Sequence, residues 1–139
     1  MSAKVAKVAK IGGIFPFFIV SDVATAIGFY RDKLGFEVTY TAEPEDLYFA
    51  IVRRDAAMIM VKAVEAPPLP NPERDPAARW DAFVSVPDPD ALATEFTSRG
   101  VAFSAPLADT HSGLRGFELK DVDGYVLFFG RPIADAPDA

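Results

Sequence analysis

The chain has 139 residues, half of them apolar, and a formal net charge of −6. This size and composition favour one folded domain with one sizeable core, and the acidic charge argues against nucleic acid, whose phosphates require a basic surface. Cysteine is absent, which excludes disulfides and thiolate metal sites and favours a cytoplasmic protein. No apolar stretch is long enough to span a membrane, so neither nucleic acid nor a membrane is an expected partner.

The first predicted element is a strand at residues 14–20, apolar at every position except Pro16 and therefore expected to be buried on both faces. A helix follows, which Ser21 or Asp22 can cap and which Gly35 can terminate in the left-handed conformation. Its apolar positions recur every three or four residues, as expected for a helix with one buried face: Val23, Ile27, Tyr30 and Leu34.

Three short strands are predicted next, at about residues 36–41, 48–53 and 58–62. The first half of the chain, about 14–62, thus has the order βαβββ. Five prolines then fall within residues 63–79, and their density predicts an extended linker that contains neither helix nor central strand.

The pattern begins again after the linker, in a second half at about residues 80–130. An apolar strand at 80–86 precedes a helix that Asp88 or Asp90 can cap and that Gly100 terminates. Strands are predicted near 101–103, 116–121 and 125–129, the last two joined by a hairpin turn at Asp121, Asp123 and Gly124. The composition of residues 134–139 predicts a disordered tail.

The two halves align as an internal repeat. Asp22 and Tyr30 lie 66 residues before Asp88 and Phe96, and Met58 lies 67 before Tyr125. We therefore predict an α+β fold, a single domain (1–139) of two βαβββ repeats. Each repeat leaves the sheet face away from its helix uncovered, which favours a cleft between the two sheets.

Two segments carry a resemblance to a known family: FYRDKLGFE at residues 29–37 and GLRGFELKDVDGYVLFFG at residues 113–130. With the repeat, they resemble the vicinal oxygen chelate superfamily, which includes glyoxalase I, extradiol dioxygenases and bleomycin resistance proteins. The resemblance covers about residues 14–132. It implies the paired-sheet cleft of the glyoxalase/bleomycin resistance fold.

Metal-using members of that superfamily take four ligands, usually His, Gln or Glu, from the first and last strand of each half. Counting from the matching motifs, the equivalent positions here are Phe15, Val61, Asp81 and Phe128. Only Asp81 carries a donor, and one carboxylate does not hold a divalent ion against water. We therefore predict no metal, no other cofactor and no catalytic residue.

The bleomycin resistance branch is the more similar one, because its members are also metal-free and carry a proline at the position of Pro16. They bind their drug in aromatic clefts at a dimer interface. The resemblance implies a homodimeric antibiotic-resistance protein that sequesters an aromatic or cationic small molecule.

The predicted cleft is aromatic, because side chains two residues apart along a strand share a face. Phe17 then lies beside Phe15, and Phe83 beside Asp81, while Trp80 can stack on a planar ligand at the mouth of the cleft. Asp81 can attract a cation, and His111 and Arg115 can reach the ligand from a loop and from the seventh strand. The candidate ligand-binding residues are Phe15, Phe17, Trp80, Asp81, Phe83, His111, Arg115 and Phe128.

Other interpretations remain open. The rings can pack on one another as a second core, Trp80 can anchor the linker, and Asp81 and His111 can be ordinary surface groups. The chain can also be a lyase, isomerase or dioxygenase with a displaced metal site, or with His111 acting together with Glu118. A third possibility is a dimeric scaffold whose cleft is closed by its own side chains.

Overall fold

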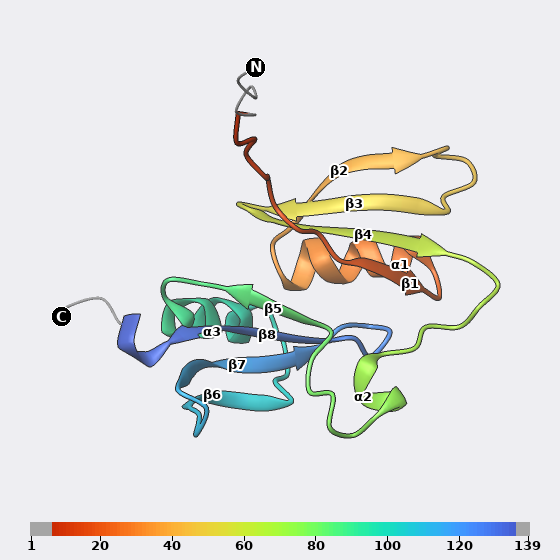
Figure 1. Ribbon diagram of the computed structural model, residues 1–139. Helices are drawn as coiled ribbons and strands as arrows, with labels where there is room; N and C mark the ends of the chain where they lie inside the picture. The colour runs from red at the N-terminus through yellow and green to blue at the C-terminus, as the bar shows by residue number, and fades with distance from the viewer. Residues whose placement is uncertain (1–6, 136–139) are drawn as a thin grey trace, which may run out of the picture.

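The computed structural model describes residues 7–135, and these form two four-stranded sheets of matching topology (Figure 1). The first sheet has the order β1-β4-β3-β2 and the second the order β5-β8-β7-β6. In each sheet the first and last strands of the repeat pair in parallel, and the other neighbours are antiparallel. The predicted α+β fold of two βαβββ repeats is confirmed. The strands are β1 (Phe17–Val20), β2 (Glu37–Ala42), β3 (Phe49–Arg54), β4 (Ala57–Ala63), β5 (Ala82–Ser85), β6 (Ala105–Asp109), β7 (Leu114–Lys120) and β8 (Val126–Pro132).

The first helix, α1 (Val23–Gly28), begins at Asp22, whose carboxylate accepts hydrogen bonds from the Thr25 amide at 2.9 Å and hydroxyl at 2.6 Å. It continues as a wider π-helical turn, η1 (Phe29–Lys33), and the chain reverses at Gly35 with φ +72°. In the second half, α3 (Pro89–Ser98) begins at Asp88, and the chain turns at Gly100 with φ +80°. A short 3-10 helix, η2 (Ile133–Asp135), follows β8.

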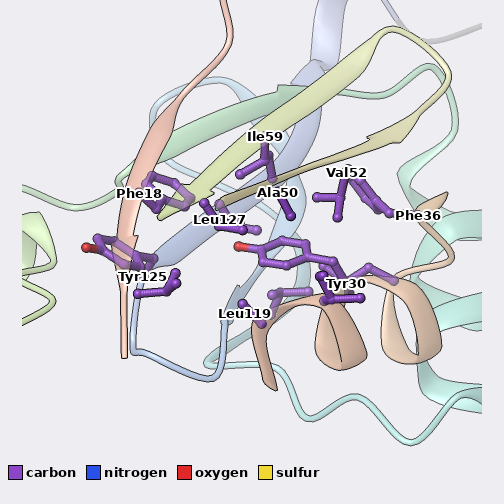
Figure 2. Close-up of a cluster of buried hydrophobic side chains, with 14 of the residues drawn as sticks. Phe18, Tyr30, Phe36, Ala50, Val52, Ile59, Leu119, Tyr125 and Leu127 are labelled. Atoms are coloured by element: carbon purple, nitrogen blue, oxygen red, sulfur yellow. The ribbon is translucent and has the colours of Figure 1, made fainter. Parts of the chain in front are cut away.

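One core joins the two halves. Figure 2 shows Tyr30 of the first half among Ala50 and Val52 of its own sheet and Leu119 and Leu127 of the second sheet. Both sheets therefore turn their helix-bearing faces toward a shared interior, and their other faces point outward. Burial on this scale supplies most of the stability of a small domain. The buried members are Phe18, Val20, Val23, Ala26, Ile27, Tyr30, Leu34, Phe36, Ala50, Val52, Ile59, Val61, Ala93, Phe96, Phe117, Leu119, Tyr125, Leu127 and Phe129.

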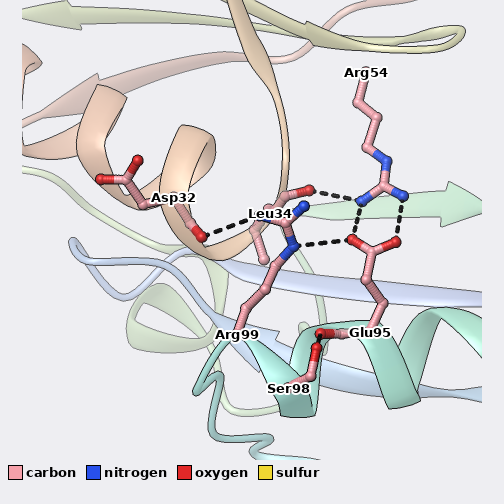
Figure 3. Close-up of polar contacts among 6 residues, drawn as sticks. All are labelled: Asp32, Leu34, Arg54, Glu95, Ser98 and Arg99. Atoms are coloured by element: carbon pink, nitrogen blue, oxygen red, sulfur yellow. Dashed lines mark hydrogen bonds and ion pairs between the residues drawn. The ribbon is translucent and has the colours of Figure 1, made fainter.

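Polar contacts also tie the halves together at the helix ends (Figure 3). Arg54 donates from both terminal nitrogens to the Glu95 carboxylate, each at 2.7 Å, and Arg99 donates from Nε to the same group at 3.1 Å. Arg99 also reaches the carbonyl of Asp32 at 3.3 Å. These bonds fix the position of α3 against the first repeat.

Three predictions about elements are wrong. The first strand begins at Phe17 instead of residue 14, and it is buried on one face only, since Phe18 and Val20 are 6% and 1% exposed but Phe17 is 53% exposed. The linker holds a short helix, α2 (Asn71–Arg74), because Pro72 lies in the first turn, where no amide hydrogen is needed. The strand expected at 101–103 lies at 105–109 instead, where β6 pairs with β7.

The tail predicted to be disordered, residues 134–139, falls largely outside the described part of the chain. Between residues 7 and 135, no helix is long and apolar enough to cross a membrane.

Candidate ligand-binding surface

The outward face of the second sheet carries three stacked aromatic rings. Trp80 stacks on Phe128 with ring centroids 4.5 Å apart and an angle of 25° between the planes. Phe83 lies 5.6 Å from Phe128 at 23°, and 5.7 Å from Trp80. We call Trp80, Phe83 and Phe128 the tryptophan cluster. The structure thus brings together three of the predicted ligand-binding residues, from the end of the linker, β5 and β8.

Two glycines allow the Phe128 ring to lie against the sheet. A Cβ atom on Gly116 would collide with the Phe129 carbonyl oxygen and meet the Phe128 ring at 2.7 Å, and one on Gly130 would meet the ring at 2.5 Å. With no side chains at these positions, Phe128 lies flat and is only 4% exposed. Phe83 remains 42% exposed. The cluster therefore has a fixed base and an open edge.

The outward face of the first sheet carries a second group of rings. Phe49 lies 6.0 Å from Phe17 and 6.0 Å from Tyr40, and we call these three residues the phenylalanine cluster. Phe17 and Tyr40 are each 53% exposed. Large exposed rings on a sheet face are typical of a surface that contacts a ligand or another chain.

The strand pairing corrects one of the positions equivalent to a metal ligand. Phe17 pairs with Met60 in the first sheet and Phe83 with Phe128 in the second, so Met60, not Val61, corresponds to Phe128. Val61 points into the core and is 0% exposed. The hairpin turns differ in length, since β3 and β4 are separated by residues 55–56 but β7 and β8 by residues 121–125, and this offsets the last strands.

The residues at these positions do not fit a metal ion. Phe15, Met60 and Phe128 offer no oxygen or nitrogen donor, and both oxygens of Asp81 are occupied by backbone amides. Its Oδ1 accepts from Asn71 N at 2.7 Å and its Oδ2 from Val126 N at 2.8 Å. Asp81 thus connects the linker to β8. Among residues 7–135, no three His, Asp or Glu side chains are grouped as a metal site.

Three other predicted residues have other surroundings. The half-buried Phe15 ring folds over Gly13, within 2.6 Å of where a Cβ would be. Arg115 points to the helix side of its sheet, where it donates to Asp90 from Nε and Nη2, each at 2.8 Å, and to Asp109 at 3.1 Å. His111 is exposed in the turn between β6 and β7. Arg115 and His111 therefore point away from the tryptophan cluster, whereas the neighbours of Phe15, Ile14 and Pro16, line a cavity together with Phe83.

Glu118 is the carboxylate nearest in register to the tryptophan cluster. It lies directly across from Phe128 in the antiparallel β7–β8 pair, on the outward face, and its Oε1 accepts from the Ser104 hydroxyl at 2.8 Å. The strand from residue 114 to Glu118 is about 13 Å long at roughly 3.3 Å per residue. His111 precedes that strand, so it does not pair with Glu118 as a catalytic acid and base.

A carboxylate that the sequence analysis placed in a hairpin turn is buried in the shared core. Asp121 is 6% exposed and accepts from Tyr30 Oη at 2.6 Å and from the amides of Asp123 and Tyr125, each at 2.9 Å. Burial raises the pKa of Asp121 to about 6, and that of Tyr30 well above its usual value. The helical spacing of Tyr30 predicts its burial, but nothing in the sequence pairs it with a residue 91 positions away.

The tryptophan cluster is open in the single chain. A cavity of about 220 Å³ between the sheets is lined by Ile14, Pro16, Met58 and Phe83, among others, but not by Trp80 or Phe128. Within one chain, the cavity between the sheets is thus not the aromatic cleft that the sequence predicts. What the single chain provides is an aromatic surface next to the junction of its two sheets.

Comparison with known proteins agrees with this architecture. Residues 10–129 match the model of the Glyoxalase/Bleomycin resistance protein/Dioxygenase superfamily, and the chain belongs to this family. The match confirms the resemblance seen in the sequence. A comparison with curated protein sequences finds no match.

Solved structures with the same fold include proteins that bind bleomycin. The bleomycin-binding protein of bleomycin-producing Streptomyces verticillus, complexed with copper(II)-bleomycin, is 27% identical, with 88% of this chain and 97% of that chain covered and a TM-score of 0.64. A second bleomycin-binding protein, complexed with bleomycin, is 19% identical (87% and 98% covered, TM-score 0.67). TioX from Micromonospora sp. ML1 is 20% identical (87% and 99%, TM-score 0.67). The last two likenesses concern the fold alone.

Proposed function

We propose that this protein is a metal-free binding protein that sequesters an aromatic or cationic small molecule, as the bleomycin-binding relatives bind their drug. The observation that carries the proposal is the tryptophan cluster. The plane of the Trp80 ring is tilted by 25° from that of Phe128, and the plane of the Phe83 ring by 23°. A pre-ordered stack gains further stacking energy from a planar ligand without first losing conformational freedom.

The charge beside the rings favours a ligand with a cationic group. Glu118 lies across from Phe128, and only its Oε1 has a hydrogen-bond partner among the described residues. Aromatic faces also attract cations. Glu118 thereby takes the role that we predicted for Asp81, whose two oxygens are already bonded within the chain.

The closed binding site requires a second surface, and we propose that a second copy of the chain supplies it. The tryptophan and phenylalanine clusters lie on outward faces with residues 42% and 53% exposed. A two-fold axis can place one cluster opposite the other and so form two equivalent clefts. The absence of cysteine is consistent with our further proposal that the protein works in the cytoplasm.

Calorimetric titration with metal-free bleomycin tests this function. We expect saturable binding by the wild type and at least a tenfold loss for Phe83→Ala, which removes an exposed ring without opening the core. Val122→Ala is the matched control, because Val122 is 48% exposed and lies in the β7–β8 turn. Equal binding by wild type and Phe83→Ala would contradict the proposed surface.

Sedimentation equilibrium of the same samples tests the second copy. The proposal predicts a dimer whose dissociation constant rises on Phe17→Asp, since this change places a charge in the phenylalanine cluster. A wild-type protein that stays monomeric when saturated with ligand would exclude the shared site. Stoichiometric zinc, iron or manganese in the purified protein would favour an enzyme of the same superfamily instead.

A further inference from the structure

A cavity of about 550 Å³ lies between the two halves on the helix side, and residues 56–57 and 84–85 separate it from the smaller cavity that Phe83 lines. The first half contributes Phe36, the β3–β4 turn (residues 55–56) and the strand residues on either side of it, Arg54 and Ala57. The second half contributes residues 84–88, the α3 residues Ala91, Leu92, Glu95 and Phe96, and Phe129. Its volume is in the range of sites for small molecules. Trp80, Phe83 and Phe128 do not line it.

The walls of this cavity are rigid and mainly apolar. Phe36, Phe96 and Phe129 belong to the shared core and are 4% or less exposed. Phe96 packs edge-on against Phe129, with centroids 5.3 Å apart. A ligand body bound here would therefore contact surfaces that are already ordered, which lowers the entropic cost of binding.

The ionisable residues of the lining carry an excess of negative charge, with one arginine against three carboxylates. Glu95 accepts two bonds of 2.7 Å from Arg54 and one of 3.1 Å from Arg99, which lies outside the lining. Among the described residues, Asp55 and Asp88 are the lining carboxylates without an ion-pair partner. Asp88 uses Oδ1 to accept from the Ala91 amide at 3.1 Å, and within residues 7–135 its Oδ2 has no partner, nor does the Asp55 carboxylate. One carboxylate comes from each half, so both can face a ligand held between the halves.

We infer that this cavity is a second ligand site, one for a small apolar cation. The ammonium group lies between the carboxylates of Asp55 and Asp88, and the apolar body packs on the rings and on Leu92. An anion is disfavoured by both free carboxylates, and the one cation of the lining, Arg54, is engaged by Glu95.

Titration with 2-phenylethylammonium tests the site, with the uncharged 2-phenylethanol as the isosteric probe. Amide signals of Val86, Leu92 and Glu95 in the two-dimensional NMR spectrum should move saturably with the ammonium. The alcohol should bind at least about tenfold more weakly, and the Trp80 indole signal should stay in place. Equal affinity for both probes would overturn the inference.

The double variant Asp55→Asn, Asp88→Asn removes the two negative charges and keeps the shape of the side chains, so it measures what the charges contribute to binding. Asparagine suits both backbones, since Asp55 has a left-handed φ of +52° and Asp88 is a helix cap. We expect about tenfold weaker ammonium binding and unchanged binding of the alcohol. The matched control, Glu45→Gln with Asp46→Asn, removes two exposed charges from the loop at the other end of β3 and should bind as the wild type does.

A third variant, Ala91→Phe, fills the cavity from its exposed rim and should abolish the NMR response. Undiminished ammonium binding by this variant or by the double variant would show that the cation binds elsewhere. Loss of binding on Phe83→Ala, together with movement of the Trp80 signal, would assign it to the tryptophan cluster. Because the two sites have separate readouts, bleomycin binding can fail while this inference stands, and the reverse.

Discussion

The Tyr30 hydroxyl donates a 2.6 Å hydrogen bond to Asp121 Oδ2 inside the core. The bond joins the helical segment of the first repeat to the last hairpin turn of the second. The donor, the Tyr30 hydroxyl, is neutral, and the acceptor is a carboxylate whose pKa is raised by burial. The contact therefore links the packing of the two halves to the protonation state of one residue.

Replacing Tyr30 by phenylalanine should destabilise the fold by about 1–2 kcal/mol, because a buried acceptor loses one of its three donors while the ring keeps its packing. Urea unfolding followed by circular dichroism measures the change. Tyr40→Phe is the control, since Tyr40 is 53% exposed and its loss of a hydroxyl should cost almost nothing. Equal stability of Tyr30→Phe and the wild type would show that the bond contributes nothing.

Asp121 should also make stability depend on pH. Its pKa is raised from 3.8 to about 6, so the folded state holds the proton more tightly than the unfolded state. The stabilisation is fully present below about pH 4 and is lost as the pH rises through 6, on the order of 3 kcal/mol in all. Asp121→Asn removes this titration, and its amide can still accept from the two backbone amides.

Comparing the two proteins at pH 4, 5, 6 and 7 isolates the effect, because all other titrating groups are common to both. The unfolding free energy of the wild type, relative to Asp121→Asn, should fall steadily across this range. A constant difference would mean that Asp121 titrates at its ordinary pKa and that its burial carries no electrostatic cost.

The sequence predicts most of the fold, because the repeat leaves its signals in local patterns. Caps at Asp22 and Asp88 and left-handed glycines at 35 and 100 mark both long helices, and the structure has them. The strand expected at 101–103 was misplaced since Val101 and Phe103 pack against the core from irregular chain. Burial alone does not distinguish such a segment from a strand.

The candidate site is less predictable, since it depends on long-range register and on hydrogen-bond partners. The alternation of side chains along β1 and β8 correctly places Phe17 and Phe128 on the outward faces. The same count from the hairpin turn fails in β4, because the two hairpin turns differ in length and Val61 lies in the core. Asp81 has the right position for a ligand, yet Asn71 and Val126 occupy its oxygens. Neither partner is visible in a sequence motif.

The ion pair between Arg54 of the first half and Glu95 of the second should make a measurable contribution to the free energy of unfolding. Its side chains are 28% and 33% exposed, and the bidentate geometry favours a coupling energy of about 1 kcal/mol in a double-mutant cycle of Arg54→Met and Glu95→Gln. The control cycle uses Arg31 and Asp32, which are 56% and 63% exposed and should couple by close to zero. Indistinguishable couplings for the two pairs would contradict a structural role.

Gly116→Ala should destabilise the protein by about 2–3 kcal/mol, because the new methyl group would meet the Phe129 carbonyl oxygen, which the sheet holds in place. Thermal unfolding measures this loss, and ligand affinity should fall with it as Phe128 is displaced. Gly28→Ala is the matched control. Nothing lies within 4 Å of its added carbon, and alanine in a helix should raise stability by up to about 1 kcal/mol.

The most direct test of the proposed binding surface is the fluorescence of Trp80, the only tryptophan in the chain, during titration with metal-free bleomycin. Because Trp80 stacks on Phe128 in the proposed site, we expect saturable quenching that gives the same dissociation constant as calorimetry and that Phe83→Ala weakens. Calorimetric binding without any change in Trp80 emission would place the ligand elsewhere and contradict the account.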